Sequence, residues 1–63
     1  MKKFLVRILD RQTKKTLTEY EIEALDWYYA RHIGIDNYRK EHPEAKDYVA
    51  DSLEIGGNDN DYQ

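Results

Sequence analysis

The chain has 63 residues, of which 37% are charged and 40% hydrophobic, and it contains no cysteine. This length allows a single domain, and the lack of cysteine excludes disulfides and cysteine-ligated zinc as sources of stability. No stretch of more than four residues lacks a charged side chain, which excludes a membrane-spanning helix and a secretory signal. We therefore expect a soluble cytoplasmic protein of marginal stability, for which self-association would bury further surface.

The net charge of −3 combines two halves of opposite sign. Residues 1–16 hold six basic residues and one acid, whereas residues 17–63 hold four basic residues and twelve acids. An acidic protein is repelled by nucleic acid at long range, so we do not expect a nucleic-acid partner. A hairpin that contacts phosphate remains an alternative, and its basic residues would be Arg7, Arg11, Lys14 and Lys15.

The N-terminal part of the chain predicts a β-hairpin. Residues 3–10 place apolar side chains at alternate positions, residues 11–15 are polar, and residues 16–24 (TLTEYEIEA) alternate along their whole length. One face of the second strand then carries Thr18, Tyr20, Ile22 and Ala24, and the other carries Glu19, Glu21 and Glu23. Three glutamates on one face repel one another, so we expect Lys3 and Arg7 of the first strand to lie opposite them.

Residues 27–41 change to helical spacing. Asp26 is a suitable N-cap, and His42 before Pro43 predicts the end of the helix. Gly34 inside a helix costs about 1 kcal/mol, which predicts a close approach to the sheet or to a second copy. The apolar stripe is formed by Trp27, Ala30, Ile33, Gly34 and Tyr38, of which Trp27 and Tyr38, together with Tyr20, are expected in the core.

Residues 47–55 (DYVADSLEI) predict a last strand whose inner face is ambiguous, because apolar residues occur on both sides of it. A bulge near residues 50–52 would reconcile the two faces. Residues 56–63 are rich in glycine, acidic and polar residues, and we expect them to be a disordered tail.

The expected fold is α+β: one β-β-α-β domain over residues 1–55, with a helix packed on a three-stranded sheet. The rival interpretation is a single long helix over residues 17–41, because a heptad can also be drawn there. The alternating glutamates favour the strand.

Catalytic chemistry has little material in this chain. Ser52 lacks the sequence context of a nucleophile, and loops that cradle phosphate are absent. His32 and Asp36 stand one helical turn apart and could share a cation, but two ligands on an exposed helix make a weak site. We therefore expect no enzyme activity, no metal, no cofactor and no small-molecule substrate.

The aromatic and leucine residues instead suggest contact surfaces. Tyr28 and Tyr29 cannot both face the sheet, because adjacent helical residues are about 100° apart. If the alternating apolar residues face the helix, three leucines project from the opposite side of the sheet, and such a patch usually marks a partner. The predicted interface of a homodimer or protein complex is Leu5, Leu9, Leu17, Tyr28 and Tyr29.

The run KKFLVRILDRQTKKTLTEYEIEA, followed by one helix and a short strand, resembles small β-β-α-β accessory proteins of bacteriophages and other bacterial mobile elements. This resemblance in pattern and size covers residues 2–55, and it implies the cytoplasm of a bacterial host. The chain is also similar in build and acidity to small phage inhibitors that occupy a host enzyme's DNA-binding groove, including inhibitors of uracil-DNA glycosylase.

Two functions follow as hypotheses. The first is a non-enzymatic module that binds protein or self-associates. The alternative is an acidic inhibitor or DNA mimic that blocks a host enzyme, with phosphate-like carboxylates from Glu19, Glu21, Glu23, Asp47, Asp51 and Glu54.

Overall fold

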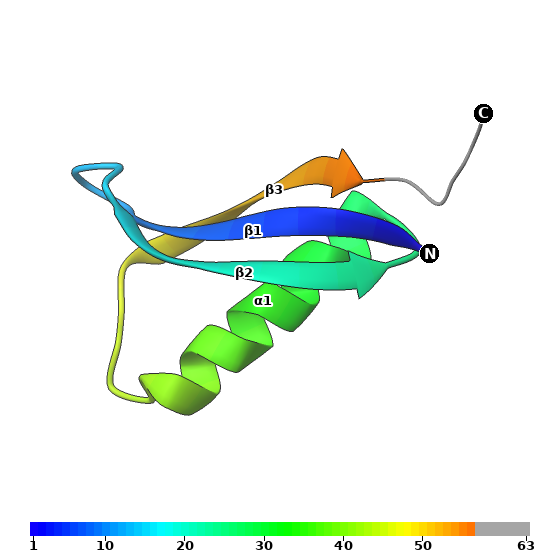
Figure 1. Cartoon of the computed structure of the whole chain (residues 1–63). Coiled ribbons are helices and arrows are strands. Elements are labelled where there is room, and N and C mark those ends of the chain that lie inside the picture. Colours follow the sequence, from blue (N-terminus) through cyan, green and yellow to red (C-terminus); the bar gives the residue numbers. More distant parts are fainter. Residues whose placement is uncertain (57–63) are drawn as a thin grey trace.

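The computed structural model describes residues 1–56 and contains one helix packed on a three-stranded antiparallel sheet (Figure 1). The elements are β1 (Lys2–Asp10), β2 (Thr16–Ala24), α1 (Trp27–Glu41) and β3 (Tyr48–Gly56). The predicted β-β-α-β order is confirmed, and the single helix over residues 17–41 is wrong because its first half is β2. Gly56 ends β3 and does not begin the tail; the predicted disorder of residues 57–63 lies outside the described residues.

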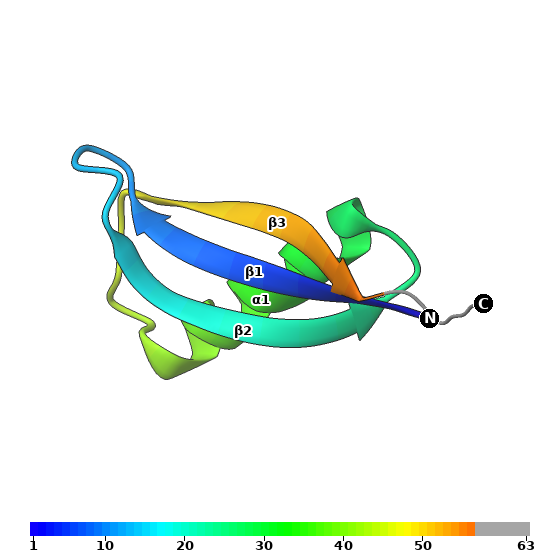
Figure 2. The ribbon, with the colours of Figure 1, turned by 45° about the horizontal axis from the view of Figure 1, so that its top comes forward.

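The first strand of the chain lies in the middle of the sheet. The strand order is β2-β1-β3, and β1 pairs antiparallel with both neighbours (Figure 2). Val6, at the centre of β1, pairs with Tyr20 on one side and with Ser52 on the other. Helix α1 crosses one face diagonally, from near β3 toward β2: Arg31 Nε donates to the Ala50 carbonyl at 3.1 Å, and the Tyr20 hydroxyl donates to Glu41 Oε1 at 2.7 Å.

The register of β1 with β3 resolves which face of β3 is buried. Ala50 and Ser52 pair with the buried Ile8 and Val6, so these two small residues lie on the helix side. The predicted bulge near residues 50–52 is wrong, because pairing is regular there and the irregularity falls between Lys3 and Phe4. Small side chains on the inner face leave room for α1, and the larger Val49 and Leu53 consequently project from the opposite face.

A five-residue loop, residues 11–15, closes the hairpin. The Asp10 carboxylate accepts hydrogen bonds from the backbone N–H of Gln12 at 2.8 Å and of Thr13 at 3.0 Å. These bonds, the Thr13 one foremost, lower the pKa of the Asp10 carboxyl below its ordinary value. Lys14 adopts a left-handed conformation with φ of 66°, which directs the chain back into β2. Lys14 therefore supplies the positive φ that the Gly of an Asn-Gly pair supplies in shorter turns, and the Asp10 carboxylate holds the loop through its two hydrogen bonds.

The ends of α1 follow the expected capping. Asp26 Oδ1 accepts from the Tyr29 backbone N–H at 2.8 Å, which satisfies one of the free donors of the first turn. At the other end, the His42 N–H donates to the Tyr38 carbonyl at 2.8 Å, and Pro43 follows.

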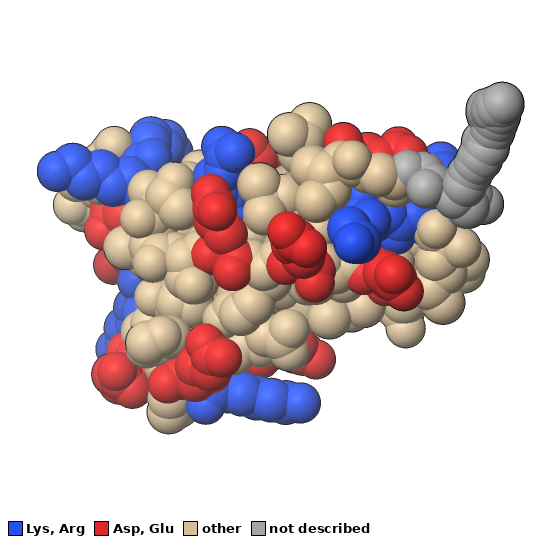
Figure 3. Space-filling view, in the orientation of Figure 1, with Lys and Arg blue, Asp and Glu red and all other residues tan. Residues whose placement is uncertain are grey.

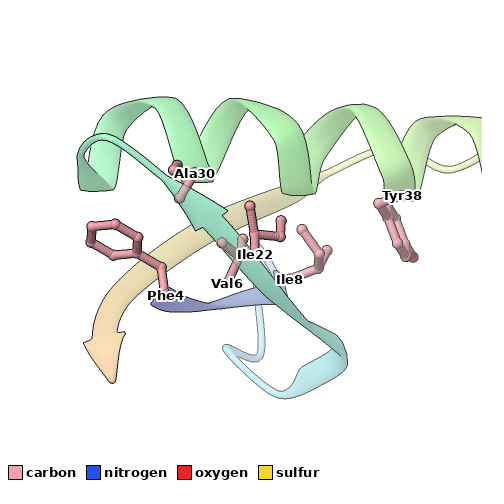
Figure 4. Packing of buried hydrophobic residues seen from close by; sticks show 7 residues of the cluster. Phe4, Val6, Ile8, Ile22, Ala30 and Tyr38 are labelled. Carbon is pink, nitrogen blue, oxygen red and sulfur yellow. The ribbon is translucent and has the colours of Figure 1, made fainter. Parts of the chain in front are cut away.

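The core lies between α1 and the inner face of the sheet (Figure 4). Its buried residues are Phe4, Val6, Ile8, Ile22, Ala24, Ala30 and Tyr38. Gly34 lies directly over β1: a β-carbon there would be 3.0 Å from Val6 Cβ and closer still to Val6 Cγ1. The predicted close approach of the helix to the sheet is confirmed, and it compensates the helix propensity that glycine forfeits.

The predicted burial of Trp27 is wrong. Its side chain is 57% exposed, although it falls on the same helical stripe as the buried Ala30 and Tyr38. Ala30 is the first buried residue of α1, and Phe4 fills the space beneath this end of the helix (Figure 4). Tyr38 is buried as expected, and Tyr20 packs against the core while half-buried.

Substitution of Gly34 by alanine is predicted to destabilise the fold by about 1–3 kcal/mol, because the added methyl overpacks Val6. The gain of about 1 kcal/mol in helix propensity offsets only part of this cost. Urea unfolding of Gly34→Ala, Val6→Ala and the double variant measures the effect, and the double variant should lose less stability than the sum of the single variants. A Gly34→Ala chain more stable than the wild type would contradict the close contact.

Tyr20 is predicted to titrate well above the ordinary pKa of a tyrosine hydroxyl. Burial, and next the hydrogen bond to Glu41, raise the pKa of its hydroxyl from 10.0 to about 12. Because the pKa is higher in the folded state, this group stabilises the fold below about pH 10, and the contribution is lost as the pH rises toward 12. Tyrosinate absorbance of the wild type minus that of Tyr20→Phe isolates the group. Glu41→Gln should lower its pKa, and titration of wild-type Tyr20 near pH 10 would refute the assignment.

Candidate protein-binding surfaces

The face of the sheet opposite α1, called the outer face below, has no described element packed on it (Figures 1 and 2). By the alternation of each strand and the observed register, its side chains are Lys3, Leu5, Arg7 and Leu9 from β1, Glu19, Glu21 and Glu23 from β2, and Val49, Asp51 and Leu53 from β3. The helix buries only the opposite side of each strand, so the apolar residues of this face lack a partner in the described chain.

Apolar side chains of the outer face meet across β1 and β3. Leu5 pairs with Leu53, and Leu9 pairs with Val49. Leu53 is 59% exposed, while the other three are half-buried by their neighbours. Leu17 is the extra residue of an irregularity in the β1–β2 pairing, since Leu9 pairs with Thr16 and Ile8 with Thr18.

A row of carboxylates follows β2 beside these apolar pairs (Figure 3). The expected cations lie opposite two of them: Arg7 Nε is 3.2 Å from Glu19 Oε2, and Lys3 pairs in register with Glu23. Glu21 lies opposite Leu5 and has no cation across the strand pair. Both partners of the Arg7–Glu19 pair are more than 40% exposed, so the ion pair contributes less than about 1 kcal/mol.

A shallow depression of about 150 Å³ lies in the outer face, lined by Leu5, Arg7, Asp51, Ser52 and Leu53. Pockets that enclose small ligands usually measure about 300–1,000 Å³ and cover most of the ligand. The shape of this face therefore suits contact with another macromolecule better than capture of a small molecule.

The structure divides the predicted homodimer interface between two surfaces. Leu5 and Leu9 belong to the outer face, whereas Tyr28 and Tyr29 begin α1 on the other side of the sheet. Val49 and Leu53 complete the outer face, and the ambiguity of the last strand concealed them. Their alternation with Asp51 was the signal available in the sequence.

The predicted acidic face is likewise only partly assembled. Four of its six carboxylates share the outer face, namely Glu19, Glu21, Glu23 and Asp51. Glu54 pairs with the buried Phe4 and so lies on the helix side of β3. Asp47 lies in the loop before β3 with φ of 58°, and its carbonyl accepts from the Arg11 N–H at 2.9 Å.

A second group of exposed residues, called the aromatic end below, lies around the start of α1 and comprises Leu25, Trp27, Tyr28 and Tyr29. All four side chains are at least 55% exposed. The Trp27 and Tyr28 rings meet edge-on with centroids 5.8 Å apart, and Tyr28 meets His32 at 4.6 Å. Exposed aromatic side chains with polar tips are typical of protein interfaces.

The residues considered for chemistry are not gathered into a site. Within residues 1–56, no three His, Asp or Glu side chains come together as possible metal ligands. His32 packs against the Tyr28 ring, and the buried Ser52 hydroxyl lies on the inner face without a hydrogen-bond partner. Across the same described part of the chain, no helix has the length and apolar character that crossing a bilayer requires.

Comparisons with protein-family models, with curated proteins and with solved structures find no match to this chain.

Proposed function

We propose that the protein is a non-enzymatic protein-binding module and that the outer face is its docking surface. The observation that carries this proposal is two apolar pairs in register, Leu5 with Leu53 and Leu9 with Val49, on a sheet face that no described element covers. Contiguous exposed apolar side chains rimmed by charges are characteristic of surfaces that bind other proteins.

The two sheet edges support a face as the docking surface. Edge strands pair readily with other chains unless charges or covering groups oppose it. The edge strand β2 carries three glutamates, and on the edge strand β3 the Ala50 carbonyl accepts a hydrogen bond from Arg31 Nε. Strand addition is thus opposed by charge along β2 and by the bound carbonyl of Ala50 on β3, whereas no described group covers the apolar pairs at the centre of the outer face.

The proposed role as an accessory protein of a phage or mobile element, with a bacterial cytoplasmic location, is consistent with a small binding module. The inhibitor or DNA-mimic alternative draws support from the row of glutamates on β2. Lys3 and Arg7 interrupt the acidic charge of that face, however, and two of the six proposed carboxylates lie elsewhere. Protein binding through the apolar pairs is therefore better supported than imitation of a phosphate backbone.

Self-association is a second candidate, and the aromatic end favours it. Four neighbouring apolar side chains, Leu25, Trp27, Tyr28 and Tyr29, are largely exposed at the start of α1. Pairing of two copies through this surface would remove them from water without requiring either sheet edge.

We predict that Leu53→Lys and Leu5→Lys abolish partner capture, because each places a charge among the apolar pairs of the outer face. Affinity capture from a lysate of the source cells, quantified by mass spectrometry after nuclease treatment, measures the loss relative to the wild type. Tyr29→Ser, at the aromatic end, is the matched control and should capture the partner normally. Equal capture by all variants, or no stoichiometric partner with the wild type, contradicts the proposal.

Homodimer formation through the aromatic end can be read from the only tryptophan of the chain, which is 57% exposed. If copies associate there, emission of Trp27 shifts to shorter wavelength as concentration rises from about 0.1 μM to about 100 μM. Tyr28→Ser should weaken the shift, and Leu53→Lys should leave it unchanged. Constant emission together with a monomer mass in sedimentation equilibrium would exclude this candidate.

A further inference from the structure

Resting on the proposed function, we infer that the outer face binds an amphipathic helix with an apolar stripe and with Lys or Arg along one flank of that stripe. The stripe lies over the apolar pairs of β1 and β3, and the basic flank lies over the glutamates of β2.

The two rows of the outer face have matching lengths. Leu5 to Leu9 and Glu19 to Glu23 each cover five residues of a strand, and the four steps between the end residues span about 13 Å. That distance corresponds to two to three turns of an α-helix. Adjacent strands are about 4.8 Å apart, so three strands have the width of one helix with its side chains, about 10 Å. Helix α1 already packs on the inner face of the same three strands, which shows that the sheet accommodates such a partner.

The charge of the outer face determines which side chains the partner helix carries along its flank. The outer face holds two cations, Lys3 and Arg7, and four carboxylates, which leaves a net charge of −2. Glu21 has no cation across the β1–β2 pair, and Asp51, in register with Arg7 on β3, faces a guanidinium that already forms an ion pair with Glu19. A partner with Lys or Arg on one side supplies the missing charge, and rim contacts of this kind set specificity and association rate.

The same charge count argues against a second copy as the occupant. A two-fold axis across the strands stacks β2 on the β2 of the other copy, which places glutamates over glutamates. An axis along the strands stacks β2 on β3, which brings Asp51 and apolar residues to the glutamates. Both arrangements leave Glu21 without a cation and place net −2 against net −2.

Addition of a partner strand to a sheet edge is also disfavoured. The edge strand β2 carries the charged glutamates, and on the edge strand β3 the Ala50 carbonyl already accepts a hydrogen bond from Arg31 Nε. A strand added at the free edge of β2 would moreover leave the Leu5–Leu53 pair exposed, since this pair belongs to β1 and β3. A helix on the outer face covers the apolar pairs and the glutamates together.

The test is panning of a displayed library of random peptides about 16 residues long, which is about 24 Å as a helix. The immobilised wild-type chain should enrich peptides with apolar residues at helical spacing and Lys or Arg along one flank. The most enriched peptide, added to the ¹⁵N-labelled chain, should shift the amide signals of Leu5, Leu9 and Leu53. Leu53→Lys should remove the binding.

The role of the glutamates is tested with two matched pairs of substitutions. The double substitution Glu21→Gln with Glu23→Gln should lower the affinity for the enriched peptide by about three- to tenfold at low salt. It should also reduce the salt dependence of this binding. Asp36→Asn with Glu44→Gln removes the same charge away from the outer face and should change affinity less than twofold. Glu19 is retained in both, so the Arg7–Glu19 ion pair stays intact.

The inference would be overturned by enriched peptides whose apolar residues recur at every second position, or whose flanks are acidic. It would also be overturned by peptides that shift only the amide signals of the aromatic end. The same holds if the wild-type chain enriches no peptide more strongly than the Leu53→Lys chain does. The cellular partner separates this failure from failure of the proposed function. If Leu53→Lys loses that partner while the two Gln substitutions leave its capture and salt dependence unchanged, the outer face binds protein but not by a basic flank. If Leu53→Lys retains the partner, the proposed function itself fails.

Discussion

The fold depends on how closely α1 approaches the middle of the sheet. Gly34 permits contact between the helix backbone and Val6, with Ile22 beside it, and this contact places Ala30 and Tyr38 over either end of the core. Close packing of the helix also requires small residues on the inner face of β3, namely Ala50 and Ser52, because larger side chains there would push α1 away from the sheet. A short chain without disulfides thus obtains its stability from tight packing of few side chains.

The division of the apolar residues follows from this close packing. One helix covers one face of three strands, and the inner face accepts only the side chains that fit beneath it. Leu5, Leu9, Val49 and Leu53 are therefore left on the outer face, and Leu25 and Trp27 are left beyond the first buried turn. The candidate binding surfaces are what remains after the core has been filled, and their position is a consequence of the fold.

Local patterns allowed most of the fold to be predicted. Alternation in β2, the Asp26 cap and Pro43 each act within a few residues, and the structure agrees with all three. The inner face of β3 and the exposure of Trp27 depend on where the helix lies over the sheet, which no local pattern records. For the same reason the predicted interface combined Leu5 with Tyr28, two residues that share chemistry but not a surface. Leu5 and Leu9 were accessible to prediction because alternation with Phe4 and Val6 along β1 determines their side.

The central position of β1 also has a consequence for the order in which the chain assembles. The hairpin of β1 and β2 joins neighbours in sequence, whereas β1 and β3 join residues as distant as Lys3 and Gly56. During synthesis the residues of β1 and β2 therefore emerge before those of β3, and β1 then lacks its second neighbour. In the complete fold the Asp10 carboxylate holds the hairpin loop, and the Arg11–Asp47 hydrogen bond joins this loop to the segment that leads into β3. A nascent chain that stops before β3 would leave one edge of the apolar strand β1 unpaired, and an unpaired apolar edge promotes aggregation. Pairing of β3 with β1 covers this edge.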